Sequence, residues 1–259
     1  MNQTNLKKAL SKLPLGEVKY FDSIGSTNNE ALAWATGGAQ DLSIVIADEQ
    51  TAGRGRLDRK WFTPKGAGLA LSLILHPSIQ EKPYLTRMVG LAALAVVDAL
   101  QTRGLITQVK WPNDVLLNGR KVAGILVESV WSGEEVDCLV IGIGINVLKE
   151  AVPAAELLQF PSTSLEESLG SDVSPEVILH DILAGLIALR PHIGSDSFIA
   201  SWEKTLAFRG EQVQIAEGNG NSSTGKLLGL EPDGSLRLSD EQGNSITVRF
   251  GDVRLRPHA

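Results

Sequence analysis

Residues 48–62 read DEQTAGRGRLDRKWF, a basic, glycine-containing stretch between two apolar runs at 42–47 and 69–75. The two runs predict buried strands on either side of a loop. Between residues 53 and 65 the chain carries three arginines and two lysines against one aspartate, although its net charge is -6. Glycine lets a backbone approach a ligand closely, and arginine presents a planar fork of donors to phosphate or carboxylate. The stretch therefore predicts an anion-binding loop, with a solvated surface loop as the alternative.

Length and composition indicate a globular protein with one large domain, or a large and a small one: 259 residues, 43% hydrophobic and 21% charged. Residues 1–15 lack the apolar core of a secretory signal, and no uninterrupted run of about 18 apolar residues is present, so we expect a cytoplasmic protein without membrane contact. The acidic net charge argues against a general nucleic-acid binder. Cys138 is the single cysteine and lies in an apolar run, which predicts a buried thiol.

A second informative stretch, residues 109–128 (VKWPNDVLLNGRKVAGILVE), predicts a β-hairpin. Asn118-Gly119 favours a two-residue turn that pairs 115–117 with 121–127. Lys121 begins an otherwise apolar strand, where its ammonium group can point at a bound anion in a partly dry pocket. A strand-end lysine in solvent is the alternative. Before the hairpin, Pro112 cannot donate to a ladder, so residues 111–114 are expected to form an irregular turn that presents Asn113 and Asp114 inward.

The other patterns up to residue 209 predict an amphipathic lead-in at 1–16, a strand at 18–21, a helix at 27–34, buried strands at 42–47 and 69–75, a buried helix at 88–100, a strand at 136–147, a loop at 149–172, an amphipathic helix at 175–189 and a short helix at 198–206. Thr27 and Glu30 fit a capping box, with Ser26 just outside the helix, where a hydroxyl and free amides can meet a polar ligand. Gly142 and Gly144 within a strand indicate close approach of a neighbour or a ligand.

From residue 210 the pattern changes to short strands at 213–215, 225–230, 235–238 and 246–249, separated by Gly- and Asp-rich turns. Regularly spaced short strands predict a small all-β barrel of the SH3 type. Residues 220–226 nearly spell a Walker A loop. However, Leu227 stands where Ser or Thr is required and a strand pattern follows, so we predict a hairpin turn there.

Together these stretches resemble the bacterial biotin protein ligases, also called biotin–acetyl-CoA-carboxylase ligases. The matching motifs are Ser26-Thr27-Asn28, Gln50 with Gly53-Arg54-Gly55-Arg56, Lys60-Trp61, Lys110-Trp111-Pro112-Asn113-Asp114, Gly119-Arg120-Lys121-Val122-Ala123-Gly124-Ile125 and Gly142-Ile143-Gly144-Ile145-Asn146. Six motifs in order, within a likeness over about 18–259, make the resemblance specific, whereas each alone is weak. It implies an α+β fold: a class II synthetase-like catalytic domain at 1–209, with a mixed sheet and packed helices, and an SH3-like domain at 210–259.

The resemblance also implies a two-step ligase. ATP and biotin give biotinyl-5'-adenylate and pyrophosphate, and a lysine of a biotin carboxyl carrier protein then attacks the mixed anhydride. Because a carboxylate must approach a phosphate, cationic side chains are needed, and Lys121, Arg54 and Arg56 are the catalytic candidates. Mg²⁺ would screen the polyphosphate, with Asp114 as a candidate contact, either direct or through water.

The remaining candidates bind biotin or the nucleotide. By resemblance, Ser26, Thr27 and Gln50 contact the ureido ring of biotin, whose N–H groups and carbonyl match hydroxyls and an amide. Trp61 is expected to form a wall against the ligand and Asn146 to face the nucleotide. The full set is Ser26, Thr27, Asn28, Gln50, Gly53, Gly55, Trp61, Lys110, Asn113, Asp114, Gly124 and Asn146. Since the adenylate is labile in water, we expect residues 53–65 to close over it.

Two other functions remain open at this point. A lipoate or octanoate protein ligase shares the fold, but lipoate lacks a ring with N–H groups, so the polar set favours biotin. A catalytically inactive biotin or nucleotide sensor would be expected to lack Lys121 or the arginines, which are present. Only 17 residues precede Val18, so the expectation is a form without the N-terminal DNA-binding domain of many relatives. Family members often dimerise through the catalytic sheet, and the sequence leaves a homodimer open.

Overall fold

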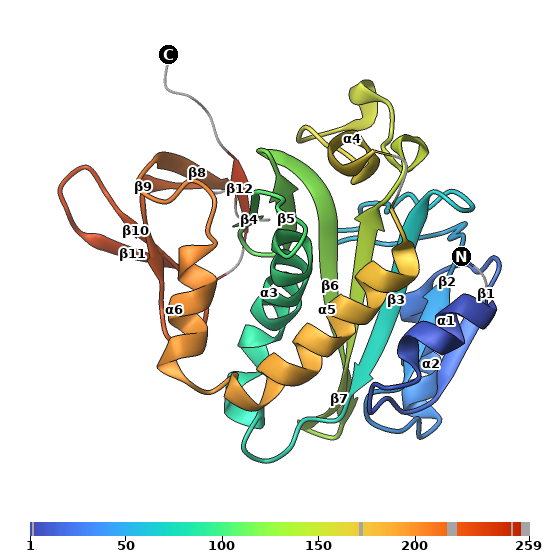
Figure 1. The fold of residues 1–259 in the computed structure, drawn as a ribbon. Coiled ribbons are helices and arrows are strands. Elements are labelled where there is room, and N and C mark those ends of the chain that lie inside the picture. The colour runs from blue at the N-terminus through green and yellow to red at the C-terminus, as the bar shows by residue number, and fades with distance from the viewer. Residues whose placement is uncertain (2, 171–172, 217–221, 250, 255–259) are drawn as a thin grey trace.

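The computed structural model describes residues 1, 3–170, 173–216, 222–249 and 251–254, which form two sheets with packed helices (Figure 1). The large sheet has seven strands in the order β1-β2-β3-β7-β6-β5-β4. Its strands are β1 (Val18–Phe21), β2 (Ile44–Ala47), β3 (Gly68–Leu75), β4 (Thr107–Lys110), β5 (Asp114–Leu117), β6 (Arg120–Ser132) and β7 (Glu135–Asn146). The pair β1 and β2 is parallel and the other pairs are antiparallel, so the sheet is mixed.

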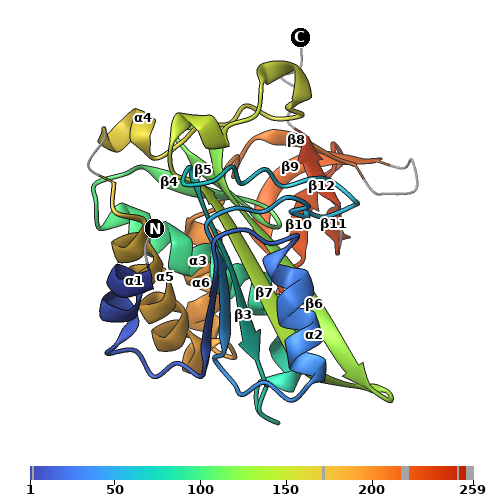
Figure 2. The same ribbon diagram turned by 90° about the vertical axis from the view of Figure 1, so that its right-hand side faces the viewer.

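The helices lie on both faces of this sheet. They are α1 (Gln3–Leu10), α2 (Thr27–Thr36), α3 (Met88–Gln101), α4 (Glu166–Leu169), α5 (Pro175–Leu189) and α6 (Asp196–Lys204), with short 3-10 turns η1 (Lys82–Arg87), η2 (Lys149–Ala151), η3 (Ala155–Leu157) and η4 (Arg190–His192). Figure 2 shows α2 on one side of the sheet and α1, α3 and α5 on the other. The α+β class expected from the sequence is confirmed.

Alternation along the strands divides the apolar residues between two cores. In β2, Ile44 and Ile46 join the core under α3 and α5, whereas Val45 joins the smaller core under α2. Every residue of β2 and β3 is buried, because helices cover both faces of the sheet at these strands. Cys138 is buried in the smaller core, and burial raises the pKa of its thiol, which suits a structural residue better than a nucleophile.

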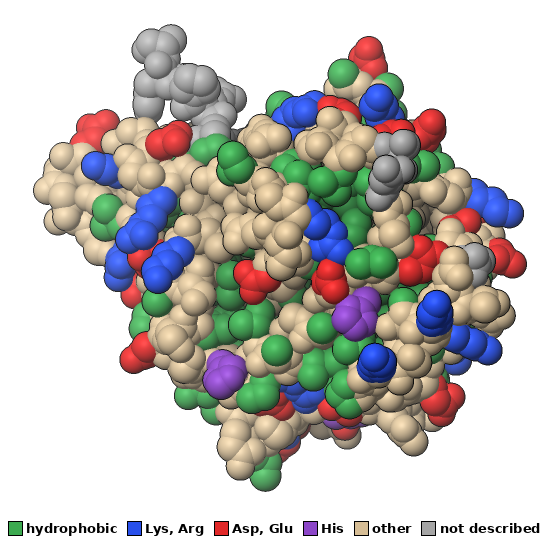
Figure 3. Space-filling view, viewed as in Figure 1, with side chains coloured by type: hydrophobic (Ala, Val, Ile, Leu, Met, Phe, Trp, Pro, Cys, Tyr) green, Lys and Arg blue, Asp and Glu red, His purple; other side chains and the backbone are tan. Residues whose placement is uncertain are grey.

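The segment Lys82–Gln101, formed by η1 and α3, is long and apolar enough by length and composition to cross a membrane, and among the described residues it is the only helix that is. Its mean hydropathy is 1.4, but 67% of the window is buried inside the fold. It packs against α5 and against strands β4 to β7. These contacts are those of a central helix between a sheet and a second helix. On the face that carries α5 and α6, acidic and basic side chains are interspersed (Figure 3).

A second, antiparallel sheet of five strands follows, in the order β11-β10-β9-β8-β12. Its strands are β8 (Gln212–Ala216), β9 (Ser222–Leu230), β10 (Leu236–Ser239), β11 (Ser245–Val248) and β12 (Asp252–Arg254). The short strands predicted after residue 210 thus pair with one another in a sheet of their own. The predicted turn at 220–226 lies partly outside the described residues, and its described part, 222–226, is wrong as a turn: it belongs to β9, which begins before the predicted strand at 225–230.

The turn between β9 and β10 docks the second sheet on the larger part of the molecule. Arg87 is 4% exposed and donates through Nε to Pro232 O at 2.7 Å. Trp111, in the turn before β5, donates through Nε1 to Gly234 O at 3.0 Å. Both bonds go to backbone carbonyls, which are strong hydrogen-bond acceptors. The turn spans 111–113, one residue shorter than predicted, because Asp114 begins β5. This turn, which carries Asn113 and leads into Asp114, is thus braced from the second sheet.

The predicted hairpin is confirmed: Asn118 and Gly119 have φ values of 49° and 74°, the left-handed pair that a tight primed turn needs. The capping box is wrong by one residue. Ser26 is the N-cap and accepts from Asn29 N at 3.5 Å, Thr27 is the first helical residue, and Glu30 pairs with Lys19. Strands β4 and β12 were not predicted. The predicted loop at 149–172 contains η2, η3 and α4 within its described part.

Candidate active site

The basic stretch folds back on itself as a narrow hairpin, which we call the arginine loop (residues 53–61). Trp61 N donates to Gly53 O at 2.9 Å, and Gly55 N donates to Arg59 O at 2.7 Å. At its tip Leu57 and Asp58 have φ values of 55° and 56°, a conformation that costs non-glycine residues about 1 kcal/mol or more each. The loop is therefore built to present side chains from a defined backbone.

Glycines in the large sheet let the surrounding side chains lie directly on its backbone. A Cβ at Gly144 would come within 2.3 Å of the Trp61 ring, and a Cβ at Gly124 within 3.0 Å of it. A Cβ at Gly142 would come within 2.1 Å of Asn28 Oδ1. The close approach expected at Gly142 and Gly144 is confirmed, and the approaching groups are side chains of this chain. Trp61 and Asn28 are thereby seated on β6 and β7.

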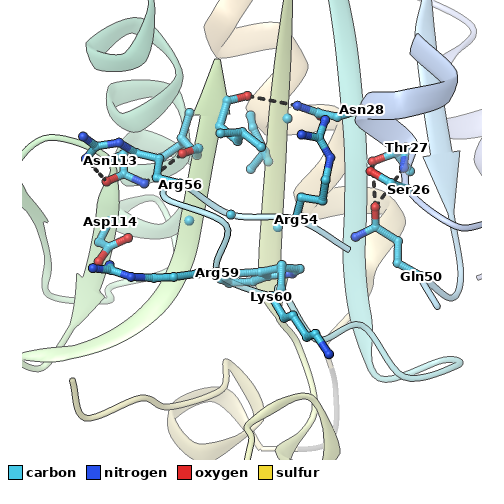
Figure 4. Close-up of a pocket in the computed structure, with 18 of the residues that line it drawn as sticks. Ser26, Thr27, Asn28, Gln50, Arg54, Arg56, Arg59, Lys60, Asn113 and Asp114 are labelled. Atoms are coloured by element: carbon cyan, nitrogen blue, oxygen red, sulfur yellow. Dashed lines mark hydrogen bonds between the residues drawn. The ribbon is translucent and has the colours of Figure 1, made fainter. Parts of the chain in front are cut away.

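Two neighbouring cavities share one wall. The first, of about 100 Å³, lies between the sheet and the arginine loop (Figure 4). The second, of about 1020 Å³, lies beside it under the segment 151–162. The residues common to both linings are Arg59, Lys60, Trp61, Asp114 and Lys121. A ligand in one cavity can therefore meet a ligand in the other at this wall.

The polar end of the first cavity is formed by the start of α2 and the root of the loop. Gln50 Oε1 accepts from Thr27 N at 2.8 Å and from Thr27 Oγ1 at 3.1 Å, and Gln50 Nε2 donates to Thr63 Oγ1 at 3.2 Å. Ser72, which sequence reasoning missed, lies in β3 with its Oγ 2.8 Å from Thr27 Oγ1. Hydroxyls and an amide thus gather at one end, as expected for a ring with N–H and C=O groups.

The shared wall carries the cationic group. Lys121 Nζ lies 2.6 Å from Asp114 Oδ1 and 5.3 Å from the centroid of the Trp61 ring. Lys110 Nζ lies 3.5 Å from Asp114 Oδ2 and 5.1 Å from the centroid of Phe160. Asp114 is 8% exposed, so its charge needs both partners. The expectation that Lys121 points into a partly dry pocket is supported by this geometry.

The arginines of the loop turn to different partners. Arg54 Nη2 lies 2.7 and 3.0 Å from the two carboxylate oxygens of Glu128. Arg56 Nη1 donates to Asn113 Oδ1 at 3.1 Å and to Gly251 O at 3.3 Å. In Figure 4, Arg59 extends toward Asp114 and Lys60 points away from the other labelled residues. Only part of the loop's charge is therefore directed at the shared wall.

Most of the predicted site residues come together around the first cavity. Its lining includes Ser26, Thr27, Asn28, Gln50, Arg54, Gly55, Arg56, Trp61, Asn113, Asp114, Lys121 and Gly124. Lys110 and Asn146 line the second cavity instead, and Asn146 Nδ2 donates to Thr163 O at 3.0 Å. Gly53 lines neither cavity; it pairs with Trp61 across the hairpin. A Cβ there would lie 2.4 Å from Trp61 O, so its place is structural as well as close to the site.

Sequence reasoning missed two further parts of the site. Glu128 lies on β6 two and four residues beyond Leu126 and Gly124, so the strand period of two would have put it on the cavity side. The segment 151–162 lines the second cavity with Ala151, Val152, Pro153, Ala154, Leu157, Leu158, Gln159, Phe160 and Ser162. It has no repeating pattern by which it could have been recognised.

The described residues contain no cluster of three or more His, Cys, Asp or Glu side chains that could hold a metal ion. Asp114, the predicted Mg²⁺ contact, already pairs with lysines through both of its oxygens. The site therefore offers a metal no protein cage of its own.

The chain is similar to known proteins over most of its length. A family model described as the biotin/lipoate A/B protein ligase family matches residues 20–146. A biotin–acetyl-CoA-carboxylase ligase of Paracoccus denitrificans is 37% identical over 232 residues, covering 85% of this chain and 93% of that protein. The chain belongs to the biotin/lipoate A/B protein ligase family. A bifunctional ligase/repressor BirA of Bacillus subtilis is 34% identical over 250 residues, covering 94% of this chain and 76% of that protein.

Solved structures of family members share the fold. A biotin protein ligase from Aquifex aeolicus in complex with biotin and ATP superimposes with a TM-score of 0.79 and 30% identity, covering 93% of this chain and 99% of that chain. The apo structure of the Aquifex ligase superimposes with a TM-score of 0.75 and 25% identity, covering 94% and 100% of the two chains. The likeness extends over both sheets of this family member.

Proposed function

We propose that the protein activates biotin with ATP to biotinyl-5'-adenylate and transfers the biotin to a lysine of a biotin carboxyl carrier protein. The single observation that carries the proposal is the pair of cavities with a common cationic wall at Lys121. An adenylating enzyme must hold an acid and a nucleotide so that a carboxylate oxygen reaches the α-phosphorus. The relatives named above as biotin ligases, and a structural neighbour that holds biotin and ATP, support biotin and ATP as the two reactants.

Biotin is proposed to occupy the first cavity. Its ureido ring would lie against Ser26, Thr27 and Gln50, and its aliphatic chain would run along Trp61 and the glycine backbone of β6 and β7 toward Lys121. In this direction the apolar chain meets the apolar wall and the carboxylate meets the ammonium group. The cavity is smaller than the usual 300 to 1,000 Å³ of ligand pockets, because the arginine loop lies down on the sheet. Entry of biotin therefore requires the loop to lift.

ATP is proposed to occupy the second cavity. Its volume suits a nucleotide, and its lining combines apolar side chains such as Leu157 and Phe160 with the amide of Asn146. The phosphates would lie at the shared wall. Mg²⁺ would arrive with the polyphosphate; Asp114 is then at most one ligand among phosphate oxygens and waters, and it must release a lysine to serve.

The chemistry asked of the protein is mainly electrostatic. When a carboxylate oxygen attacks the α-phosphorus, the bond to pyrophosphate breaks and negative charge gathers on the phosphoryl oxygens, which Lys121 and Arg56 would stabilise. In the second step the neutral amine of the carrier lysine attacks the acyl carbon and AMP leaves. Arg54, also predicted on the linkage, would have to leave Glu128 to reach a phosphate.

Several finer expectations belong to the same proposal. The second sheet is proposed to be an SH3-like domain that begins at residue 210, after a catalytic domain at 1–209. Apart from Gly53, which lines neither cavity, and Asn28, whose amide protons are both used within the protein, the residues assigned to biotin, nucleotide and Mg²⁺ keep their predicted roles as proposals. A cytoplasmic location and a homodimer are proposed as well.

The test is biotin-dependent exchange of pyrophosphate into ATP, followed by ATP-dependent transfer of labelled biotin to an apo carrier domain. Exchange with biotin should exceed exchange with lipoate or octanoate by at least about 100-fold in kcat/KM, because acids without N–H groups leave the buried polar set unpaired. Faster exchange with lipoate would assign the protein to the other branch of the family. Binding of biotin without any exchange would assign it to the sensors.

A further inference from the structure

A continuous line of polar contacts joins the arginine loop to the polar end of the first cavity. Glu128 on β6 accepts from Arg54 through both oxygens, and its Oε2 also accepts from Asn28 Nδ2 at 2.8 Å. Asn28 Oδ1 accepts from Ser72 Oγ at 2.5 Å, and Ser72 Oγ lies 2.8 Å from Thr27 Oγ1.

Asn28 sits in this line as a connector. It is 4% exposed, and its Nδ2 donates to Leu126 O at 3.3 Å as well as to Glu128. Both protons of the amide are therefore used within the protein, and its oxygen already accepts from Ser72. Gly142 leaves the space in which the side chain lies. An asparagine held in this way has no donor left for a ligand, but it transmits the position of Glu128 to α2.

The pair between Arg54 and Glu128 is shielded enough to hold the loop. The side chains are 39% and 24% exposed, which lies between an open surface pair and a fully buried one. The carboxylate takes hydrogen bonds from two side chains, one of them charged, and such bonds are stronger than neutral ones. The residues lie 74 positions apart, so the contact closes the loop on the sheet.

We propose that Glu128 is a positioning residue that latches the arginine loop over the ligand and ties the closed loop, through Asn28, to the residues that face the head of biotin. This inference rests on the proposed function. In this proposal the two arginines of the loop have different roles. Arg54 holds the loop closed through Glu128, whereas Arg56, together with Lys121 of β6, interacts with the phosphate. Loss of the carboxylate should let biotinyl-adenylate escape before transfer.

The experiment compares four variants with the parent full chain: Glu128→Ala, Glu128→Gln, Arg54→Glu and the charge swap Arg54→Glu with Glu128→Arg. The readouts are the rate at which preformed biotinyl-adenylate dissociates, the rate of pyrophosphate exchange, and hydrogen exchange of the loop amides without ligand. Glu128→Ala and Arg54→Glu should each release adenylate at least about tenfold faster. Glu128→Gln keeps an acceptor for Asn28 but loses the ion pair, so its release rate should fall between those of Glu128→Ala and the parent.

The charge swap separates a latch from a direct contact with phosphate. A latch is restored by the swap, so adenylate release should return to within about threefold of the parent. The alternative outcome is that the swap variant releases adenylate as fast as the single variants, while the rate of pyrophosphate exchange falls in all of them. In that case Arg54 acts on the phosphate and the proposal is wrong. Adenylate retention unchanged in Glu128→Ala would overturn it as well.

Two controls keep the outcome clear. Glu30→Ala removes the ion pair with Lys19 on the outer side of α2, whose side chains are similarly exposed at 32% and 37%, and it should leave adenylate release unchanged. If the parent shows no exchange with biotin, the proposed function fails rather than the latch. In that case the loop amides still test the latch, since Gly55 N and Trp61 N should exchange faster in Glu128→Ala than in the parent. Equal rates of hydrogen exchange at these loop amides in Glu128→Ala and in the parent would refute the latch.

Discussion

The substitution Gly144→Ala tests the seating of Trp61 on the sheet. The new Cβ would lie 2.3 Å from Trp61 Cε2 and Nε1. Because carbon contacts are comfortable at about 3.5 Å, the ring must move by roughly 1.2 Å. The arginine loop can move more easily than β7, so most of the displacement should fall on the loop. A shift of about 1 Å in a positioning element costs up to about 100-fold in rate.

We therefore expect kcat/KM for biotin-dependent pyrophosphate exchange to fall by about 100-fold in Gly144→Ala. The free energy of unfolding should fall by only about 1 kcal/mol, the low end for overpacking. The assay is exchange at varied biotin concentration, with urea unfolding of the same samples. Gly185→Ala on α5 is the control, because its Cβ would lie 3.5 Å from Ala95, an ordinary contact. It should be as active as the parent and equally or more stable.

The cause is isolated by repeating Gly144→Ala in a Trp61→Ala background, where the clash no longer exists. In that background, Gly144→Ala should lower kcat/KM for pyrophosphate exchange by less than about threefold. The reasoning is refuted if Gly144→Ala alone stays within threefold of the parent, or if its cost is the same with and without the tryptophan.

Two further predictions concern charge. Lys121→Ala should lower kcat for adenylate formation by about 100- to 1,000-fold, measured by exchange, because a preorganised cation at the reacting phosphate is lost; an unchanged rate would contradict its role. Burial alone would raise the pKa of Glu81, but hydrogen bonds from Arg190 and Ser78 outweigh it and hold the pKa below 4.5. The ionised carboxylate thus contributes stability above pH 4.5 that is lost as pH falls through the lower folded value. Glu81→Gln should flatten the loss of thermal stability between about pH 5 and pH 3, and an unchanged slope would disprove this.

The elements of the large sheet could be predicted because their signals are local. Strand β2 is an uninterrupted apolar run, β3 is apolar apart from Ser72, and Asn118-Gly119 favours a tight hairpin turn on local grounds. The same local reasoning put the cap of α2 one residue too late. Thr27 and Ser26 are both good caps on local grounds, and the contact of the Thr27 amide with Gln50, 23 residues away, distinguishes them only in the fold.

Much of the candidate site could be predicted for a different reason, because motifs far apart in the chain matched one family. The motifs could not predict which side chains contact one another in the folded protein. Glu128 and Ser72 stand in apolar strands outside the quoted motifs, and their importance depends on Arg54 and Asn28 meeting them across the sheet. Likewise, the segment 151–162 acquires its place from a cavity that exists only after folding.

The wall made by Arg59, Lys60, Trp61, Asp114 and Lys121 belongs to two chambers at once. An occupant of either chamber that shifts this wall changes the free energy of filling the other. Thermodynamics then requires reciprocity: the factor by which the acid alters the affinity for the nucleotide equals the factor by which the nucleotide alters the affinity for the acid. Through these five side chains, binding of one substrate can thus change the affinity for the other before any bond between the two has formed.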